Sequence, residues 1–177
     1  MEKMSETEGK ILDLGTKLIQ SRGVNGFSFA DIAGEMGIKK ASIHYYFPSK
    51  MDLIARVLAG YSQQFEQNLG RIEEEEKQLF QRLLDFTGLY REDLEDGQVS
   101  LCTMLATERH ALSEEINRSV QEFFQLNLSW LEKVGLPANR AKDFYATLQG
   151  MQLLTKVSQN LDDFDQIMVD KIITIQK

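Results

Sequence analysis

Several residue types and patterns are scarce in this chain of 177 residues, and each absence narrows the class of protein. The single cysteine, Cys102, cannot form an internal disulfide, which excludes a disulfide-stabilised scaffold. The sequence has no apolar N-terminal segment and no apolar run approaching about 18 residues. We therefore expect neither a signal peptide nor a membrane span, and a cytoplasmic location is the default expectation.

Proline and strand patterns are scarce as well. Only two prolines occur, Pro48 and Pro137, and each stands where a helix would begin, the position that proline tolerates best. No window alternates apolar and polar residues with a period of two, which would indicate a strand. The hydrophobic content of 42% is enough for a buried core. The sequence therefore predicts an all-α protein of about nine helices.

A surplus of base is also lacking, since the net charge is −7. Residues 1–60 hold 8 Lys and Arg against 7 Asp and Glu, a net charge of +1, whereas residues 61–177 hold 12 against 20, a net charge of −8. Three of these bases, Lys39, Lys40 and Lys50, lie in or beside a short helix predicted from about Lys39 to Tyr46. Because DNA affinity depends on local phosphate neutralisation, the acidic total does not exclude binding to DNA.

The segment 29–50 predicts two short helices joined by a tight turn at Gly37, which is the layout of a helix-turn-helix. Gly37 can adopt the positive φ that a sharp helix stop requires, and Ile38 fills the angle between the helices. The pattern places on the inner face of the first helix Ala30, Ile32, Ala33 and Met36. The second helix, about Lys39 to Tyr46, can turn Ala41, Ile43 and Tyr46 inward, and its outward polar set is Lys39, Lys40, Ser42, His44 and Tyr45.

Three helix starts carry a serine three residues before an acid, the capping-box arrangement: Ser5 with Glu8, Ser28 with Asp31, and Ser49 with Asp52. We expect the first helix over about 6–22 and a fourth helix from Lys50 to the high sixties, long enough to connect a DNA-binding head to a second domain. The acids at 73–76 are interpreted as the solvated start of a fifth helix that runs to about Glu92, and Asp96-Gly97 breaks it. Leu101 to Leu112 predicts a sixth helix, and Ser113 caps a seventh.

The segment from Ile11 to Lys50 resembles the TetR family of transcriptional regulators. The matching motifs are Ile11-Leu12-Asp13, the turn Gly23-Val24-Asn25-Gly26-Phe27-Ser28, Ile32-Ala33, Gly37, His44-Tyr45-Tyr46, Phe47 and Ser49-Lys50. Two positions depart from the family pattern. Glu8 stands where members often carry an arginine, and His44 replaces the usual tyrosine in the middle of the second helix.

The resemblance implies a sequence-specific DNA-binding regulator with two domains. Residues 1–48 would form the helix-turn-helix DNA-binding domain, and residues 49–177 a C-terminal helical bundle for effector binding and dimerisation. A homodimeric repressor would then hold a near-palindromic double-stranded operator and leave it when a small molecule of unknown class binds among the fifth to eighth helices. The candidate DNA-contacting residues are Ser28, Lys39, Lys40, Ala41, Ser42, His44, Tyr45 and Lys50.

Two further sets of residues follow for the second domain. Apolar sites with few polar anchors are typical of effector pockets, and the candidate lining residues are Phe65, Phe86, Tyr90, Cys102, Leu105, Phe123, Phe124, Trp130 and Tyr145. The last two helices, over residues 138–176, resemble the family's dimer-forming pair. The candidate interface residues are Phe144, Leu148, Gly150, Met151, Leu154, Phe164, Ile167, Met168 and Ile172.

Alternatives remain open at this stage. An enzyme is disfavoured, because the sequence has no nucleophile motif, no glycine-rich phosphate loop and no distinct carboxylate pair. His44 and His110 lack a second ligand at helical spacing, so neither a metal site nor a cofactor is expected. Glu108 could counter a cationic ligand or lie exposed, and Cys102 could pack, line a pocket or sense oxidants. The protein could also be an activator, or a DNA-binding dimer controlled by a protein partner or by thiol oxidation rather than by a small effector.

Overall fold

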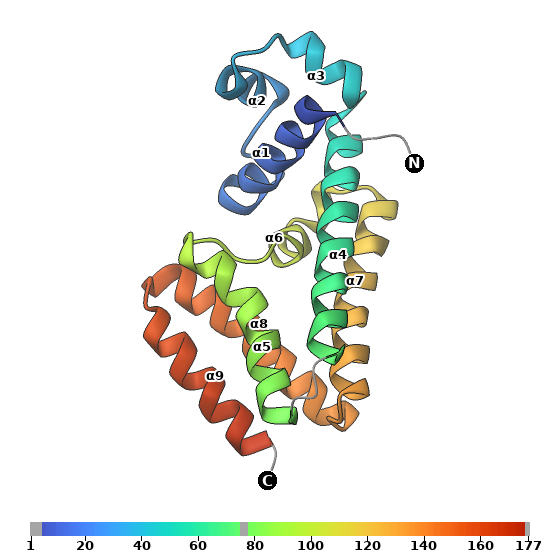
Figure 1. The fold of residues 1–177 in the computed structure, drawn as a ribbon. Helices are drawn as coiled ribbons and strands as arrows, with labels where there is room; N and C mark the ends of the chain where they lie inside the picture. The colour runs from blue at the N-terminus through green and yellow to red at the C-terminus, as the bar shows by residue number, and fades with distance from the viewer. Residues whose placement is uncertain (1–4, 75–77, 176–177) are drawn as a thin grey trace. The chain divides into compact units, whose positions relative to one another are not determined.

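The computed structural model describes residues 5–74 and 78–175, and the regular elements that these residues form are helices joined by short loops (Figure 1). No strand occurs among them, which confirms the all-α prediction. The helices are α1 (Glu6–Arg22), α2 (Phe29–Met36), α3 (Lys40–Tyr46), α4 (Lys50–Glu74), α5 (Leu79–Glu95), α6 (Leu101–Thr107), the 3₁₀ helix η1 (Arg109–Ala111), α7 (Glu114–Lys133), α8 (Ala138–Ser158) and α9 (Leu161–Ile175).

The chain divides into two compact units. The first comprises the chain up to Tyr61 together with Leu101–Val120, and the second comprises Ser62–Ser100 and the chain from Gln121 onward. Helices α4 and α7 each contribute one part to each unit. The first unit therefore contains α6 and η1 as well as α1–α3, although α6 lies far from them in the sequence.

The first unit is built around α1 and the start of α4. Ile11, Leu18 and Ile19 of α1 are buried, as are Leu53 and Ile54 of α4. The Ser28 and Ser49 capping boxes both form. In each box the serine amide donates to the carboxylate of the aspartate three residues later, and the serine side chain accepts from the backbone amide of that aspartate in return. At Ser5 the structure shows one of the two bonds of the box, in which the Glu8 amide donates to the serine oxygen at 3.1 Å.

Several sequence-based boundaries need correction. Helix α4 runs to Glu74 rather than the high sixties, so Glu73 and Glu74 end this helix instead of starting the next one. The acids at 75 and 76 lie outside the described residues. Helix α6 ends at Thr107, and Leu112 follows η1 rather than belonging to α6. Ala30 is exposed and does not face the inside of the helix-turn-helix.

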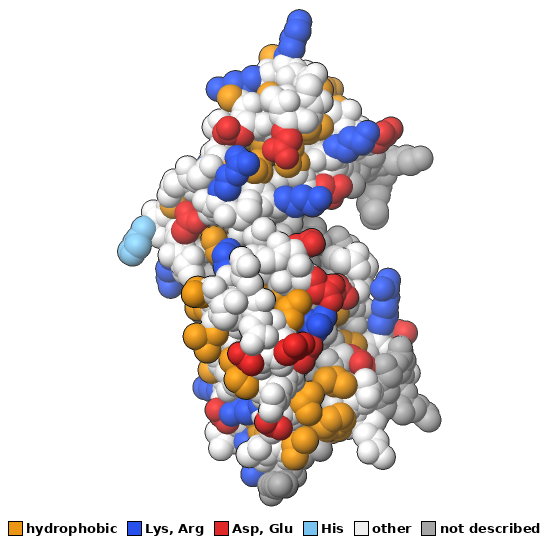
Figure 2. Space-filling model, turned by 90° about the vertical axis from the view of Figure 1, so that its left-hand side faces the viewer, with side chains coloured by type: hydrophobic (Ala, Val, Ile, Leu, Met, Phe, Trp, Pro, Cys, Tyr) orange, Lys and Arg blue, Asp and Glu red, His pale blue; other side chains and the backbone are white. Residues whose placement is uncertain are grey.

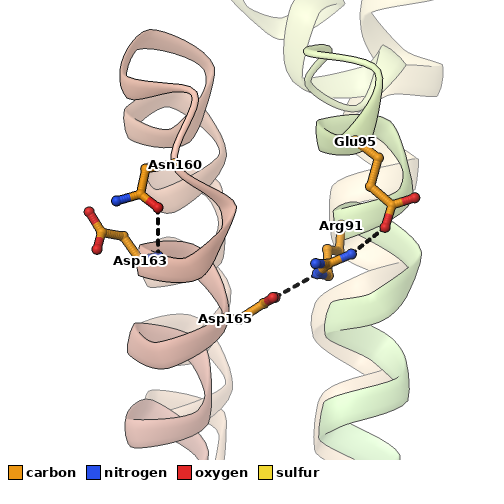
Figure 3. Close-up of polar contacts among 5 residues, drawn as sticks. All are labelled: Arg91, Glu95, Asn160, Asp163 and Asp165. Carbon is orange, nitrogen blue, oxygen red and sulfur yellow. Dashed lines mark hydrogen bonds and ion pairs between the residues drawn. The ribbon is translucent and has the colours of Figure 1, made fainter.

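In the second unit, α8 and α9 form an antiparallel hairpin, and α5 packs against both (Figure 1). Buried apolar residues from all three helices form this core, among them Phe86, Phe144 and Phe164. At its edge Arg91 of α5 donates to Asp165 of α9 at 2.6 Å and also pairs with Glu95 (Figure 3). The hydrogen bond to Asp165 raises the pKa of Arg91 above its usual value, so the guanidinium stays charged.

Among the residues that the structure describes, none of the helices combines the length and the apolar content that a membrane crossing needs.

Candidate nucleic-acid interface

Helices α2 and α3 meet at the turn that the sequence predicts. Gly37 has φ 66° and ψ 28°, the left-handed conformation, and its amide donates to the carbonyls of Ala33 and Gly34. The Ile38 amide bonds back to Ala33 at 3.0 Å. This is a helix stop that favours glycine, because a side chain is strained at this φ.

Helix α3 presents a basic and aromatic surface. Lys39, Lys40, His44 and Tyr45 are exposed, and 82% of the Tyr45 side chain is accessible. Ser42 is half-buried. A large aromatic ring left this open on a short helix contributes nothing to the core, so its surroundings suit a partner surface rather than packing.

The inward side of α3 differs in part from the sequence-based assignment. Ile43 is fully buried and Tyr46 is half-buried, but Ala41 is exposed, so the prediction that Ala41 faces inward is wrong. The exposed position agrees with its place among the candidate DNA contacts. His44 lies edge-on to Phe29 of α2, with ring centroids 4.9 Å apart, and thereby also ties α3 to α2.

Lys50 begins α4 and is half-buried rather than fully exposed. Its ammonium donates to the backbone carbonyl of Phe27 and lies 4.0 Å from the centre of the Phe27 ring. Burial lowers the pKa of Lys50, while the charges of Glu108 and Asp31 act in the opposite direction. Lys50 thus holds the chain that leads into α2, in addition to any contact with phosphate.

Ser28 caps α2 and faces solvent. Its hydroxyl and its amide both lie 2.7 Å from the Asp31 carboxylate. The hydroxyl is the larger of these influences, and both hold the pKa of Asp31 below its ordinary value of 3.8. At the other departure from the family pattern, Glu8 lies 3.8 Å from Arg56 of α4, so this carboxylate pairs within the protein.

Sequence reasoning missed the role of Glu108. Its carboxylate accepts a hydrogen bond from the Val24 amide, which lies 3.0 Å from each carboxylate oxygen, and the Asn25 amide lies at 3.4 Å. Glu108 is half-buried, so it is not the exposed carboxylate that the sequence suggested. No local pattern signals this contact, because its partners lie more than 80 positions away.

Most candidate effector residues meet in one aromatic cluster of the second unit. Phe86 stacks on Trp130 with centroids 5.1 Å apart, and Phe65 lies edge-on to Phe123 at 4.9 Å. Phe124 lies 5.7 Å from Tyr145. Except for the half-buried Phe124, the cluster is buried: Phe65, Phe86, Tyr90, Phe123, Trp130 and Tyr145. Cys102 and Leu105 are also buried, but they belong to the first unit.

A polar network runs through this aromatic cluster. The Tyr90 hydroxyl lies 3.0 Å from Asn127 Oδ1 and 3.0 Å from the Tyr145 hydroxyl, and all three residues are buried. Sequence reasoning missed Asn127, although a polar residue on the apolar stripe of α7 is a signal that could have found it. Asn127 Nδ2 also donates to the Phe123 carbonyl at 2.8 Å, so these polar groups bond to one another and to the backbone within the apolar cluster.

Two surface hollows in the second unit are lined mostly by residues outside the aromatic cluster. A hollow of about 320 Å³ is lined by Glu66, Leu69, Gly70, Glu73, Leu126, Ser129, Trp130 and Lys133. The second, of about 390 Å³, is lined by Asn68, Arg71, Ile72, Leu84, Asp85, Gly88, Leu89 and Glu92. Of the candidate effector residues, only Trp130 lines either hollow.

The candidate dimer residues fall into two groups. Buried within their own chain are Phe144, Leu148, Met151, Phe164, Met168 and Ile172, while Gly150, Leu154 and Ile167 are exposed. The hairpin also exposes apolar residues that were not among the candidates: Leu153, Val157 and Ile173. In Figure 2, hydrophobic side chains likewise gather in patches between acidic ones on the face that is drawn. No atom lies within 4 Å of a Cβ built on Gly150, so the described chain itself supplies no close backbone there.

The N-terminal part of the chain matches the sequence model of a described family. The sequence model of "Bacterial regulatory proteins, tetR family" matches residues 11–57, which include α2, α3 and the start of α4.

Full-length relatives are similar along most of the chain. The HTH-type transcriptional regulator CymR of Pseudomonas putida is 25% identical over 94% of this chain and 87% of its own length. IcaR of Staphylococcus epidermidis, a negative transcriptional regulator of a biofilm operon, is 26% identical over 64% of this chain and 60% of its own length. A crystal structure of a TetR transcriptional regulator from Legionella pneumophila is 27% identical, covers 99% of this chain and 100% of its own, and gives a TM-score of 0.89.

Proposed function

Because this chain belongs to the TetR family of transcriptional regulators, we propose that it is a homodimeric repressor whose near-palindromic operator is released when a small molecule binds. Residues 1–48 form its DNA-binding domain and residues 49–177 its effector and dimer domain. It acts in the cytoplasm and catalyses no reaction. The negative role of the relative IcaR supports repression over activation.

The observation that carries DNA binding is the open surface of α3. Lys39, Lys40 and Tyr45 are exposed together on a helix whose other side, Ile43, is buried against the head. Lysines neutralise phosphates, and an exposed ring can contact base edges or the thymine methyl group. The remaining contacts that we propose are made by Ser28, Ala41, Ser42, His44 and Lys50.

The dimer is supported by the exposed apolar side of the hairpin. On α8, Leu154 is 63% exposed and Val157 is 86% exposed, whereas Leu148 and Met151 of the same helix are buried. Adjacent exposed apolar side chains mark a surface that association covers. A twofold axis at this hairpin would pair two α3 helices with two half-sites about 34–36 Å apart on the DNA.

Effector control is supported by the aromatic cluster and its polar network. Tyr90, Asn127 and Tyr145 place mutually bonded hydroxyl and amide groups among apolar rings, a composition that suits a small organic molecule able to replace those bonds. Binding there would change the separation of the two α3 helices and weaken operator binding, typically by about 1–3 kcal/mol. Thiol control is less well supported, since Cys102 is fully buried.

The test is a fluorescence anisotropy titration against DNA flanking the protein's own gene, at fixed salt and with excess competitor DNA. We expect saturable binding to one near-palindromic segment with two protomers per segment. If that DNA is not bound, selection of bound fragments from the whole genome follows. Binding that stays weak, salt-sensitive and indifferent to sequence for every fragment would contradict the proposal.

A further inference from the structure

The turn between α1 and α2, residues 23–27, is held from two sides by charged residues of other helices. Glu108, just after α6, accepts hydrogen bonds from the amides of Val24 and Asn25. Lys50 of α4 donates to the carbonyl of Phe27, the residue before the N-cap of α2. An anion thus holds the amides at one end of the turn, and a cation holds the carbonyl at the other.

The backbone around residue 23 provides both hydrogen-bond donors and space for the Glu108 carboxylate. Val24 is buried between two helices, so its amide needs an acceptor from outside regular structure, whereas Asn25 is exposed. Gly23 makes room for the carboxylate, because a Cβ on this residue would lie 1.8 Å from Glu108 Oε1. Charge-assisted hydrogen bonds of this kind are stronger than neutral ones.

Helix α6 connects the Glu108 contact to buried residues in the same unit. Cys102 and Leu105 of α6 are fully buried, and both are candidate effector residues. Because Glu108 directly follows α6, a displacement of α6 would change the distance between its carboxylate and the Val24 amide. A hydrogen bond lengthened beyond about 3.5 Å is lost, so a small shift of α6 is enough to break the Glu108 contacts with the turn, which then keeps only its charged contact with Lys50.

We propose that Glu108 is the positioning residue that couples α6 to the helix-turn-helix. Its carboxylate holds the 23–27 turn in the position that seats α2, and through α2 it orients α3. Movement of α6 withdraws the carboxylate, loosens the turn and weakens operator binding. The inference rests on the proposed function, in which DNA binding is under effector control.

The test compares amide hydrogen exchange and operator affinity in Glu108→Ala, Glu108→Gln and the control Glu115→Gln, which removes the charge of an exposed acid on α7. In Glu108→Ala we expect exchange over residues 24–46 to rise about tenfold or more while α1, α4 and α7 keep their protection. Operator affinity should fall about tenfold or more, since hydrogen bonds to a charged group are lost. Glu108→Gln retains one acceptor oxygen and should lie between the wild type and Glu108→Ala.

Three results would overturn the inference. One is unchanged exchange over residues 24–46 in Glu108→Ala. Another is a parallel rise in exchange across the whole first unit, which indicates a general structural role. The third is a loosened turn with unaltered operator affinity. If the wild type binds no DNA, the proposed function fails, whereas the coupling is still decided by exchange in α3, which needs no DNA.

Discussion

At the scale of single residues, two independent features restrict position 23 to glycine. Its φ of 71° and ψ of 177° lie in a region that is essentially confined to glycine. The space beside it is filled by the Glu108 carboxylate. Backbone conformation and tertiary packing therefore select glycine independently of one another.

These two restrictions predict that Gly23→Ala and Glu108→Ala have non-additive effects on the free energy of unfolding. Gly23→Ala should cost about 1–3 kcal/mol from backbone strain alone, and the collision with Glu108 adds to it. In a Glu108→Ala background the collision disappears, so the two costs should sum to more than the double variant loses. Urea unfolding of the four proteins measures the difference, and strict additivity would show that the carboxylate does not occupy this space.

At the scale of elements, α3 combines an anchored side with an open one. Ile43 packs into the head and His44 contacts Phe29, while Lys39, Lys40 and Tyr45 remain accessible. Such a short helix is not stable alone in water, so its position depends on these anchors. The exposed residues can then be changed without unfolding the element.

Lys40→Ala should therefore lower operator affinity for all bound sequences alike. The slope of log K against log salt should fall in magnitude by about 1, because one phosphate contact is lost. Lys17→Ala, which removes an exposed lysine on α1, serves as the control and should leave the slope unchanged. An equal slope for Lys40→Ala and the wild type would remove Lys40 from the proposed contacts.

At the scale of the whole molecule, charge and exposed apolar surface are distributed unevenly. Residues 61–177 hold 20 acids against 12 bases, which disfavours unspecific coating of DNA by this part of the chain. The same part exposes Leu153, Leu154 and Val157 on α8. The combination fits a protein that meets DNA with one surface and its own copy with another.

The dimer can be tested without DNA. At micromolar concentration the wild type should sediment at twice its chain mass of 20.3 kDa. Val157→Glu places a charge on an 86% exposed position, so it should leave the fold intact and yield the 20.3 kDa species. Gln121→Glu adds the same charge on α7 as the control. A wild type that sediments as a single chain would contradict the dimer, as would a dimeric Val157→Glu.

The sequence by itself determined the local chemistry of the head. The Ser28–Asp31 box, the stop at Gly37 and the short α3 depend on neighbours within a few positions, so their residues specify them directly. Helix lengths were less certain. The sequence shows where α4 begins through its capping box, whereas its apolar pattern predicted an end in the high sixties and the helix reaches Glu74.

Only the tertiary structure decided which distant residues meet. Glu108 and Val24 are 84 positions apart, and Tyr90 and Asn127 are 37 apart, so no periodicity predicts either bond. The buried side of the α8–α9 hairpin could not be predicted from the sequence either, since apolar residues occur on both of its sides. Packing against α5 decides that Phe144 is enclosed and Val157 is left exposed, because burial depends on the neighbouring helices rather than on the residue's own hydrophobicity.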